Sequence, residues 1–161
     1  MKKITAYEIG WLAGIVDGEG SIGIRRGKKN GKYIFYVPHI QISNCDFTLL
    51  DKIKEMLDFY KIKYSFDIRH DARKINWSDS GRIALTNYDG ASKFLELLYP
   101  YLVSKKENAR ILLEYCKKRI AINHRGQRNN GSFTKTYDGS ENEVSEKLQS
   151  LNRKGKNNGK S

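Results

Sequence analysis

The segment from Trp11 to Ile24, WLAGIVDGEGSIGI, is the feature that most constrains the fold of this 161-residue chain. Small and apolar residues at helical spacing fill its first half, and the step Asp17-Gly18-Glu19-Gly20 alternates acid and glycine where the helix must end. The last carbonyls of a helix carry partial negative charge, so carboxylates are unfavourable there. One interpretation is an ordinary helix exit with two acids facing solvent. The other is that function requires acid at this point.

The predicted helix begins at a capping box, Thr5-x-x-Glu8, in which each residue satisfies a backbone amide of the other. Its buried face has the i, i+3, i+4, i+7 spacing of Ile9, Leu12, Ala13 and Val16. Gly10 and Gly14 lie one turn apart on another stripe, although glycine in a helix costs about 1 kcal/mol relative to alanine. Their spacing predicts that a second backbone approaches closely there.

The rest of the chain carries strand and helix patterns in turn. The predicted elements are a hairpin over Ser21–Ile42, a helix over Asp46–Tyr60, strands in YSFDIRHD and GRIALTN, a helix over Gly90–Tyr99, and a helix from a second capping box, Ser104-x-x-Glu107. The coarse order αββαββα defines an α+β domain with one four-stranded sheet. We expect the helices to cover one face of this sheet and to leave the other face free.

Three regions follow from this pattern. We assign residues 1–122 to a core domain, residues 123–151 to a polar loop and a short last helix from Ser140 to Leu151, and residues 152–161 to a basic tail. The tail is expected to be disordered.

The formal net charge of +12 indicates either a polyanionic partner or simply a solvated basic surface. Basic residues gather in three short segments, and tyrosine is abundant, which favours nucleic acid as the partner. No apolar run is long enough to span a bilayer, the N-terminus lacks a secretory signal, and Cys45 and Cys116 match no disulfide or metal spacing. The chain is therefore expected to be a soluble intracellular protein with no membrane partner.

The nonamer Leu12–Gly20, LAGIVDGEG, resembles the signature of the LAGLIDADG homing endonucleases, in which a helix with small residues ends in a D-G-D/E-G step. The element order agrees with that family, and together they cover residues 5 to about 122. The resemblance implies the αββαββα LAGLIDADG endonuclease fold, with a saddle-shaped four-stranded antiparallel sheet and a C-terminal extension.

The resemblance also implies a catalytic site. Glu19 corresponds to the metal ligand, with the Gly18 carbonyl beside it, and the metal is Mg²⁺ or another divalent ion such as Mn²⁺. Asp17 is expected to cap or orient, or else to join the metal site. Asn44, at the end of the second strand, corresponds to the polar residue that orders the attacking water, and Lys105 to a lysine near the scissile phosphate.

Only one copy of the motif is present, and one copy supplies half a saddle. In the family, two such helices pack through small residues, for which Gly10, Ala13 and Gly14 are available. The chain is therefore expected to form a homodimer on a pseudo-palindromic DNA site of about 20 base pairs.

The free face of the sheet is expected to lie in the major groove of double-stranded DNA. Alternation places five candidates for base contacts on that face: Arg25, Gln41, Asp67, Arg69 and Arg82. The basic hairpin supplies further DNA-binding candidates, mostly for phosphates: Arg26, Lys28, Lys29 and Lys32. The connection between the last two strands contributes Arg73, Lys74 and Trp77.

Together these residues predict a site-specific, metal-dependent DNA endonuclease of the intron-homing type, which hydrolyses phosphodiester bonds. Two alternatives use the same scaffold: a maturase that binds intron RNA, and a DNA-binding regulator without catalysis. Retention of Glu19 and Lys105 favours the nuclease, because a protein that only binds DNA does not need them.

Overall fold

The computed structural model describes residues 4–29, 33–70, 79–126 and 139–157. Its elements are α1 (Ala6–Glu19), β1 (Ser21–Lys29), β2 (Tyr33–Asn44), α2 (Phe47–Phe59), β3 (Ser65–Arg69), β4 (Ser80–Leu85), α3 (Tyr88–Leu98), α4 (Lys106–Gly126) and α5 (Ser140–Asn157). The predicted α+β class and αββαββα order are confirmed, and α4 and α5 follow this core.

The four strands form one antiparallel sheet in the order β1-β2-β4-β3. The β1–β2 hairpin keeps a single register from Ser21 to Lys29, so Pro38 on β2 introduces no bulge. β4 pairs with β2 only from Ile40 onward. Pro38 therefore lies where β2 has a neighbouring strand on one side only, and a residue without an N–H is tolerated at such an edge.

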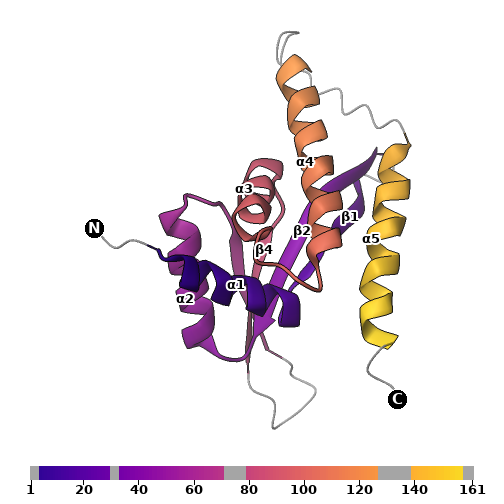
Figure 1. Cartoon of the computed structure of the whole chain (residues 1–161). Coiled ribbons are helices and arrows are strands. Elements are labelled where there is room, and N and C mark those ends of the chain that lie inside the picture. Colours follow the sequence, from indigo (N-terminus) through magenta and orange to yellow (C-terminus); the bar gives the residue numbers. More distant parts are fainter. Residues whose placement is uncertain (1–3, 30–32, 71–78, 127–138, 158–161) are drawn as a thin grey trace.

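The helices cover one face of the sheet and lie in front of it in Figure 1. Because strand side chains alternate between faces, half of them point into the helix layer. The fully buried strand residues on that side are Ile22, Ile40, Ile42, Ile83 and Leu85. The helices complete this core with apolar side chains that include Leu12, Val16, Leu50, Ile53 and Phe94. In the part of the chain that the structure describes, no helix covers the opposite face, as predicted.

The C-terminal helix α5 lies along β1, the edge strand of the sheet (Figure 1). The side-chain amide of Asn152 donates to the Ile22 carbonyl at 3.1 Å, and the amide of Asn108 on α4 donates to Asn152 Oδ1, also at 3.1 Å. These bonds satisfy polar groups at an edge that has no further strand.

The last two helices are longer than predicted. α4 runs to Gly126, and α5 runs to Asn157 and not to Leu151. Residues 152–157, which were assigned to the tail, belong to α5 in the structure. The predicted end followed the last apolar residue, whereas the polar residue Asn152 anchors the helix one position further on.

A buried ion pair joins α4 to α5. Arg119 and Glu141 are each 2% exposed, and Arg119 Nη1 lies 3.5 Å from Glu141 Oε1. Arg119 belongs by sequence to one of the basic segments, yet it is an internal residue and adds nothing to a basic surface.

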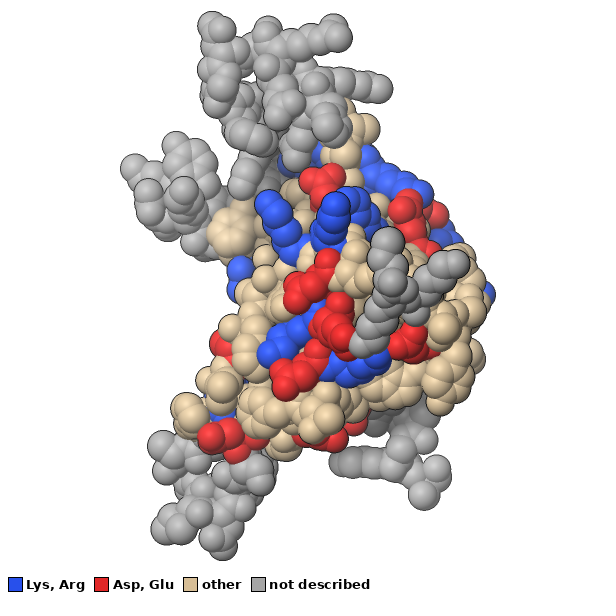
Figure 2. Space-filling model, turned by 90° about the vertical axis from the view of Figure 1, so that its left-hand side faces the viewer, with Lys and Arg blue, Asp and Glu red and all other residues tan. Residues whose placement is uncertain are grey.

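The side of the molecule that bears α2 carries charges of both signs, as Figure 2 shows. On α2 itself, Lys52 pairs with Glu55 and Lys54 pairs with Asp51. The excess of basic residues is therefore not gathered on this side. None of the helices in the described parts of the chain has the length and hydropathy that a bilayer span requires.

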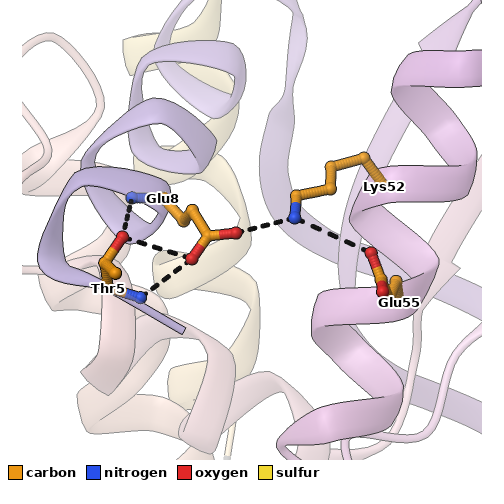
Figure 3. A network of polar contacts seen from close by, with 4 residues as sticks. All are labelled: Thr5, Glu8, Lys52 and Glu55. Atoms are coloured by element: carbon orange, nitrogen blue, oxygen red, sulfur yellow. Dashed lines mark hydrogen bonds and ion pairs between the residues drawn. The ribbon is translucent and has the colours of Figure 1, made fainter. Parts of the chain in front are cut away.

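The start of α1 is fixed by the predicted capping box and by α2 (Figure 3). The Thr5 amide donates to Glu8 Oε2 at 2.9 Å, and the Glu8 amide donates to the Thr5 hydroxyl at 3.3 Å. The other Glu8 oxygen accepts from Lys52 Nζ of α2 at 2.7 Å. The contacts hold α1 in one orientation, which determines where its acidic end lies.

Candidate active site

The exit from α1 into β1 takes a single residue, Gly20. Its backbone is extended, and its N–H donates to the Val16 carbonyl at 3.0 Å. A Cβ at this position would lie 2.6 Å from that carbonyl oxygen, so only glycine allows such a close approach. The tight exit presents Glu19, in the last turn of the helix, to solvent.

Asp17 orients the backbone that leads into α4. One carboxylate oxygen accepts from the Val103 amide at 2.7 Å, and the other accepts from the Lys105 amide at 2.8 Å. With both oxygens bonded to these amides, Asp17 has the contacts expected of an orienting residue. The predicted second capping box does not form, since Glu107 pairs with Arg110 at 2.7 Å. Asp17, from another helix, instead accepts from two amides just before the first residue of α4, Lys106.

Asn44, at the end of β2, is held between two partners. Its Nδ2 donates to Glu19 Oε2, and its Oδ1 accepts from the Asp46 amide at 2.8 Å. Asp46 itself caps α2 by accepting from the amides of Thr48 and Leu49. The fold thus places the amide predicted to order water in direct contact with the carboxylate predicted to hold the metal.

Lys105 completes the arrangement, because its Nζ donates to the Asp17 carbonyl. Burial lowers the pKa of Lys105, and the nearby Asp17 charge opposes that shift only in part. A pocket of about 550 Å³ opens between the end of α1, the start of α4 and the end of α5. Its lining includes Gly18, Glu19, Lys105, Asn108, Leu151 and Asn152. Asn108 and Asn152 were not anticipated, because nothing in the sequence links α5 to the motif.

The donor set at the end of α1 suits a hard divalent ion. The Glu19 carboxylate and the Gly18 carbonyl are the oxygen ligands that Mg²⁺ prefers, and Mg²⁺ typically takes one or two carboxylates and completes its shell with water and phosphate. Within the described residues, no three His, Cys, Asp or Glu side chains form a metal-binding cluster. One chain therefore offers an incomplete shell, to which a nucleic-acid phosphate or a second copy would add ligands.

The free face of the sheet carries all five candidates for base contacts, as the strand register shows: Arg25, Gln41, Asp67, Arg69 and Arg82. Two of them are paired, since Arg82 forms a bidentate ion pair with Asp67 that lowers the pKa of the carboxyl. Gln41 lies between His39 at 3.2 Å and Ser43 at 3.0 Å. Burial lowers the pKa of His39. His39 and Ser43 were not among the candidates, although alternation along β2 places them on this face.

Of the remaining DNA-binding candidates, the structure describes the side chain of Arg26 alone. Register puts Arg26 on the helix side of the sheet, and its side chain is exposed. Lys28 and Lys29 end β1, but their side chains lie outside the described residues, as do the whole of Lys32, Arg73, Lys74 and Trp77.

An exposed stripe of α1 runs through Gly14 and Gly18 and includes Tyr7, which is 82% exposed. Added Cβ atoms at Gly14 and Gly18 would contact nothing within 4 Å. Val103, close to the same helix end through Asp17, is 83% exposed. Ala13 is fully buried in this chain's own core and so cannot contact a second copy. The small-residue surface predicted for dimerisation is therefore limited to the glycines.

The architecture and the acidic helix end define a class of protein that is known from solved DNA complexes. The chain is similar to the homing endonuclease I-CvuI in complex with its target in the presence of Ca²⁺, with a TM-score of 0.59 and 20% identity over 89% of this chain and 95% of that one. It is also similar to the archaeal intron-encoded homing endonuclease I-Vdi141I complexed with DNA, with a TM-score of 0.56 and 16% identity over 91% and 97% of the two chains. These similarities establish the LAGLIDADG endonuclease fold.

A family model described as a LAGLIDADG-like domain matches residues 6–117. The chain belongs to this LAGLIDADG family, as the motif at Leu12–Gly20 indicated. No curated protein sequence matches the chain.

Proposed function

We propose that the chain is a site-specific double-strand DNA endonuclease that acts as a homodimer and uses a divalent metal, with Mg²⁺ as the first choice. The observation that carries this proposal is the convergence of Glu19, Asn44 and Lys105, from three separate segments, at the end of α1. A protein that only binds DNA needs a basic surface, but it has no use for an exposed carboxylate beside a desolvated lysine. The similar homing endonucleases that were solved with DNA support the same substrate.

Each residue of the candidate site has its own proposed role in phosphodiester hydrolysis. Glu19 and the Gly18 carbonyl would hold the metal, which when bound activates water and stabilises the leaving oxygen. Asn44 fixes the orientation of the Glu19 carboxylate and has its own orientation fixed by the Asp46 amide. Lys105 places its Nζ at the pocket, where it can donate to a phosphate oxygen as negative charge develops.

The homodimer is supported by the single carboxylate per chain and by the open surface of α1. Two copies packed along the Gly14 stripe would bring two Glu19 side chains close to a common axis, one for each DNA strand. The exposed apolar side chains Tyr7 and Val103 lie at the same helix and would lose solvent contact in such a dimer.

The test is a selection of cleaved sites from a randomised duplex library with Mg²⁺. We expect the wild-type protein to cut a defined set of pseudo-palindromic sites. Glu19→Gln removes the metal-binding charge and should bind the same sites without cutting them. Glu146→Gln, which neutralises an exposed carboxylate on α5 that does not line the pocket, is the matched control and should cut like the wild type.

The alternatives give different results in the same assay. Selection of bound but uncut sites by the wild type would indicate a DNA-binding regulator. Tight binding to a structured intron RNA, with no duplex selected, would indicate a maturase. Equal cleavage by wild type and Glu19→Gln would remove Glu19 from the catalytic site.

A further inference from the structure

Arg82 and Asp67 lie opposite each other on two neighbouring strands, β4 and β3, on the free face of the sheet. They are register partners in the β3–β4 pair, and β4 lies inside the sheet between β2 and β3. Arg82 donates from Nε to Asp67 Oδ1 and from Nη2 to Asp67 Oδ2, both at 2.7 Å. The geometry is a side-on bidentate ion pair, which fixes the plane of the guanidinium group as well as its position.

This pairing leaves the two side chains with unequal capacity for a further ligand. Each Asp67 oxygen already accepts a charge-assisted hydrogen bond, which leaves one lone pair on each oxygen. A guanidinium has five N–H donors, and the pair consumes one on Nε and one on Nη2. Both hydrogens of Nη1 and the second hydrogen of Nη2 remain. One hydrogen from each of these nitrogens forms the end-on edge of the group, and the other Nη1 hydrogen points back along the side chain. The Arg82 side chain is 27% exposed, and that of Asp67 is 43% exposed.

The free edge has the geometry of a guanine contact. Two parallel N–H donors match the O6 and N7 acceptors that guanine presents in the major groove. Ser43, the residue opposite Arg82 on β2, is small and leaves the other flank of the arginine open. A free arginine loses side-chain entropy when it is ordered, whereas this one is already ordered by Asp67.

We propose that Arg82 contacts one guanine in each half of the DNA site, and that Asp67 contacts no base but holds Arg82 in the orientation that recognises it. The proposal rests on the proposed DNA-binding function of this face. It replaces the sequence-based prediction of two independent base contacts with a single contact made by two cooperating residues. Asp67 is accordingly a positioning residue that determines specificity through Arg82.

The experiment is a binding selection from a randomised duplex library with the full chain, for wild type, Arg82→Lys and Asp67→Ala. We expect the wild type to require guanine at one position of each half-site. Arg82→Lys keeps the charge but not the planar fork, and should reduce the preference at that position about tenfold or more. Asp67→Ala should weaken the preference at the same position and leave all others unchanged.

Two further variants make the result decisive. Asp67→Asn, which is nearly isosteric, repeats the test if the alanine variant folds poorly. Arg25→Lys is the matched control, because Arg25 lies on the same face on β1 and has no ion-pair partner among the described residues. Asp67→Ala should have no added effect on that guanine in the Arg82→Lys background and its full effect in the Arg25→Lys background.

Contrary results are distinguishable from failure of the proposed function. If Asp67→Ala changes the preference at a position that Arg82→Lys does not affect, Asp67 contacts a base itself and the inference is wrong. If Arg82→Lys weakens binding to all duplexes equally, Arg82 contacts phosphate and the inference is also wrong. If the wild type selects and cuts sites that have no such guanine, only this inference fails. If the wild type selects no duplex sequence at all, the proposed function is wrong, and the inference that rests on it is wrong as well.

Discussion

Asp17 contributes to the site through the backbone that it holds. Its two carboxylate oxygens accept the amides of Val103 and Lys105, and Asp17→Ala leaves both amides without a protein acceptor. We expect the free energy of unfolding to fall by about 1–2 kcal/mol, as measured by urea denaturation. Cleavage should also slow, because Lys105 loses its fixed position. Glu146→Ala on α5 should change stability by less than about 0.5 kcal/mol. An unchanged urea midpoint for Asp17→Ala would show that these bonds contribute nothing to stability.

At the scale of single residues, the sequence identified residues of the candidate site but did not predict which of them contact one another. Glu19, Asn44 and Lys105 were each named from the resemblance to the family, by their positions in the sequence, and the fold brings them together. The bond from Val103 to Asp17 spans 86 residues, which no local pattern encodes. Arg119 could have been identified as internal, because it stands three residues after the buried Cys116 on the apolar stripe of α4. Its membership of a basic segment concealed this.

At the scale of elements, Glu8 joins α1 to α2 by an interaction that depends on pH. The Lys52 hydrogen bond, aided by the Thr5 amide, lowers the pKa of Glu8 from 4.5 to about 2. Since the folded-state pKa lies below the unfolded value, this stabilisation is complete above about pH 4.5 and is lost as the pH falls toward 2. We expect urea midpoints to decline more steeply over this range for wild type than for Lys52→Met.

Comparing wild type with Lys52→Met isolates the contribution of the Glu8–Lys52 interaction. Asp67 and Glu107 also have lowered pKa values, but they titrate in both proteins. Parallel pH profiles for wild type and Lys52→Met would show that Lys52 is not the main cause of the Glu8 shift. Lys54→Met removes a lysine that pairs with Asp51 on α2 and lies over the Phe66 ring of β3, but that does not contact Glu8. It is the matched control and should leave the Glu8 contribution intact.

The boundaries of the elements show where local signals suffice. The Thr5–Glu8 capping box was predicted and forms, since it needs only residues one turn apart. α3 begins at Tyr88, earlier than the predicted Gly90, because the side chain of Asn87 accepts from the Gly90 amide as its cap. The length of α5 was underestimated because tertiary bonds, and not an apolar pattern, anchor its end.

At the scale of the whole molecule, the fold of a single chain does not explain why α1 carries glycine on an exposed stripe. A Cβ at Gly14 would contact nothing within 4 Å, so the isolated fold does not require glycine there. Glycine also costs the helix about 1 kcal/mol relative to alanine. The close-packed second copy that we propose would account for it, whereas Ala13, one residue earlier, is explained by the chain's own core.

The variant Gly14→Leu distinguishes an effect on the stability of the single chain from an effect on dimer formation. Because the position is open in the monomer and leucine favours helix more than glycine does, the variant should unfold at a urea concentration equal to or above that of wild type, and close to that of Gly14→Ala, at protein concentrations where no dimer forms. The same side chain should prevent close approach of two α1 helices, so sedimentation with duplex should show a monomer, and cleavage should be lost. Glu146→Leu places leucine on an exposed helical position of α5 and should dimerise and cut normally. A Gly14→Leu protein that dimerises and cuts like wild type would place the dimer contact elsewhere, and one that fails to fold would show that the monomer itself needs the glycine.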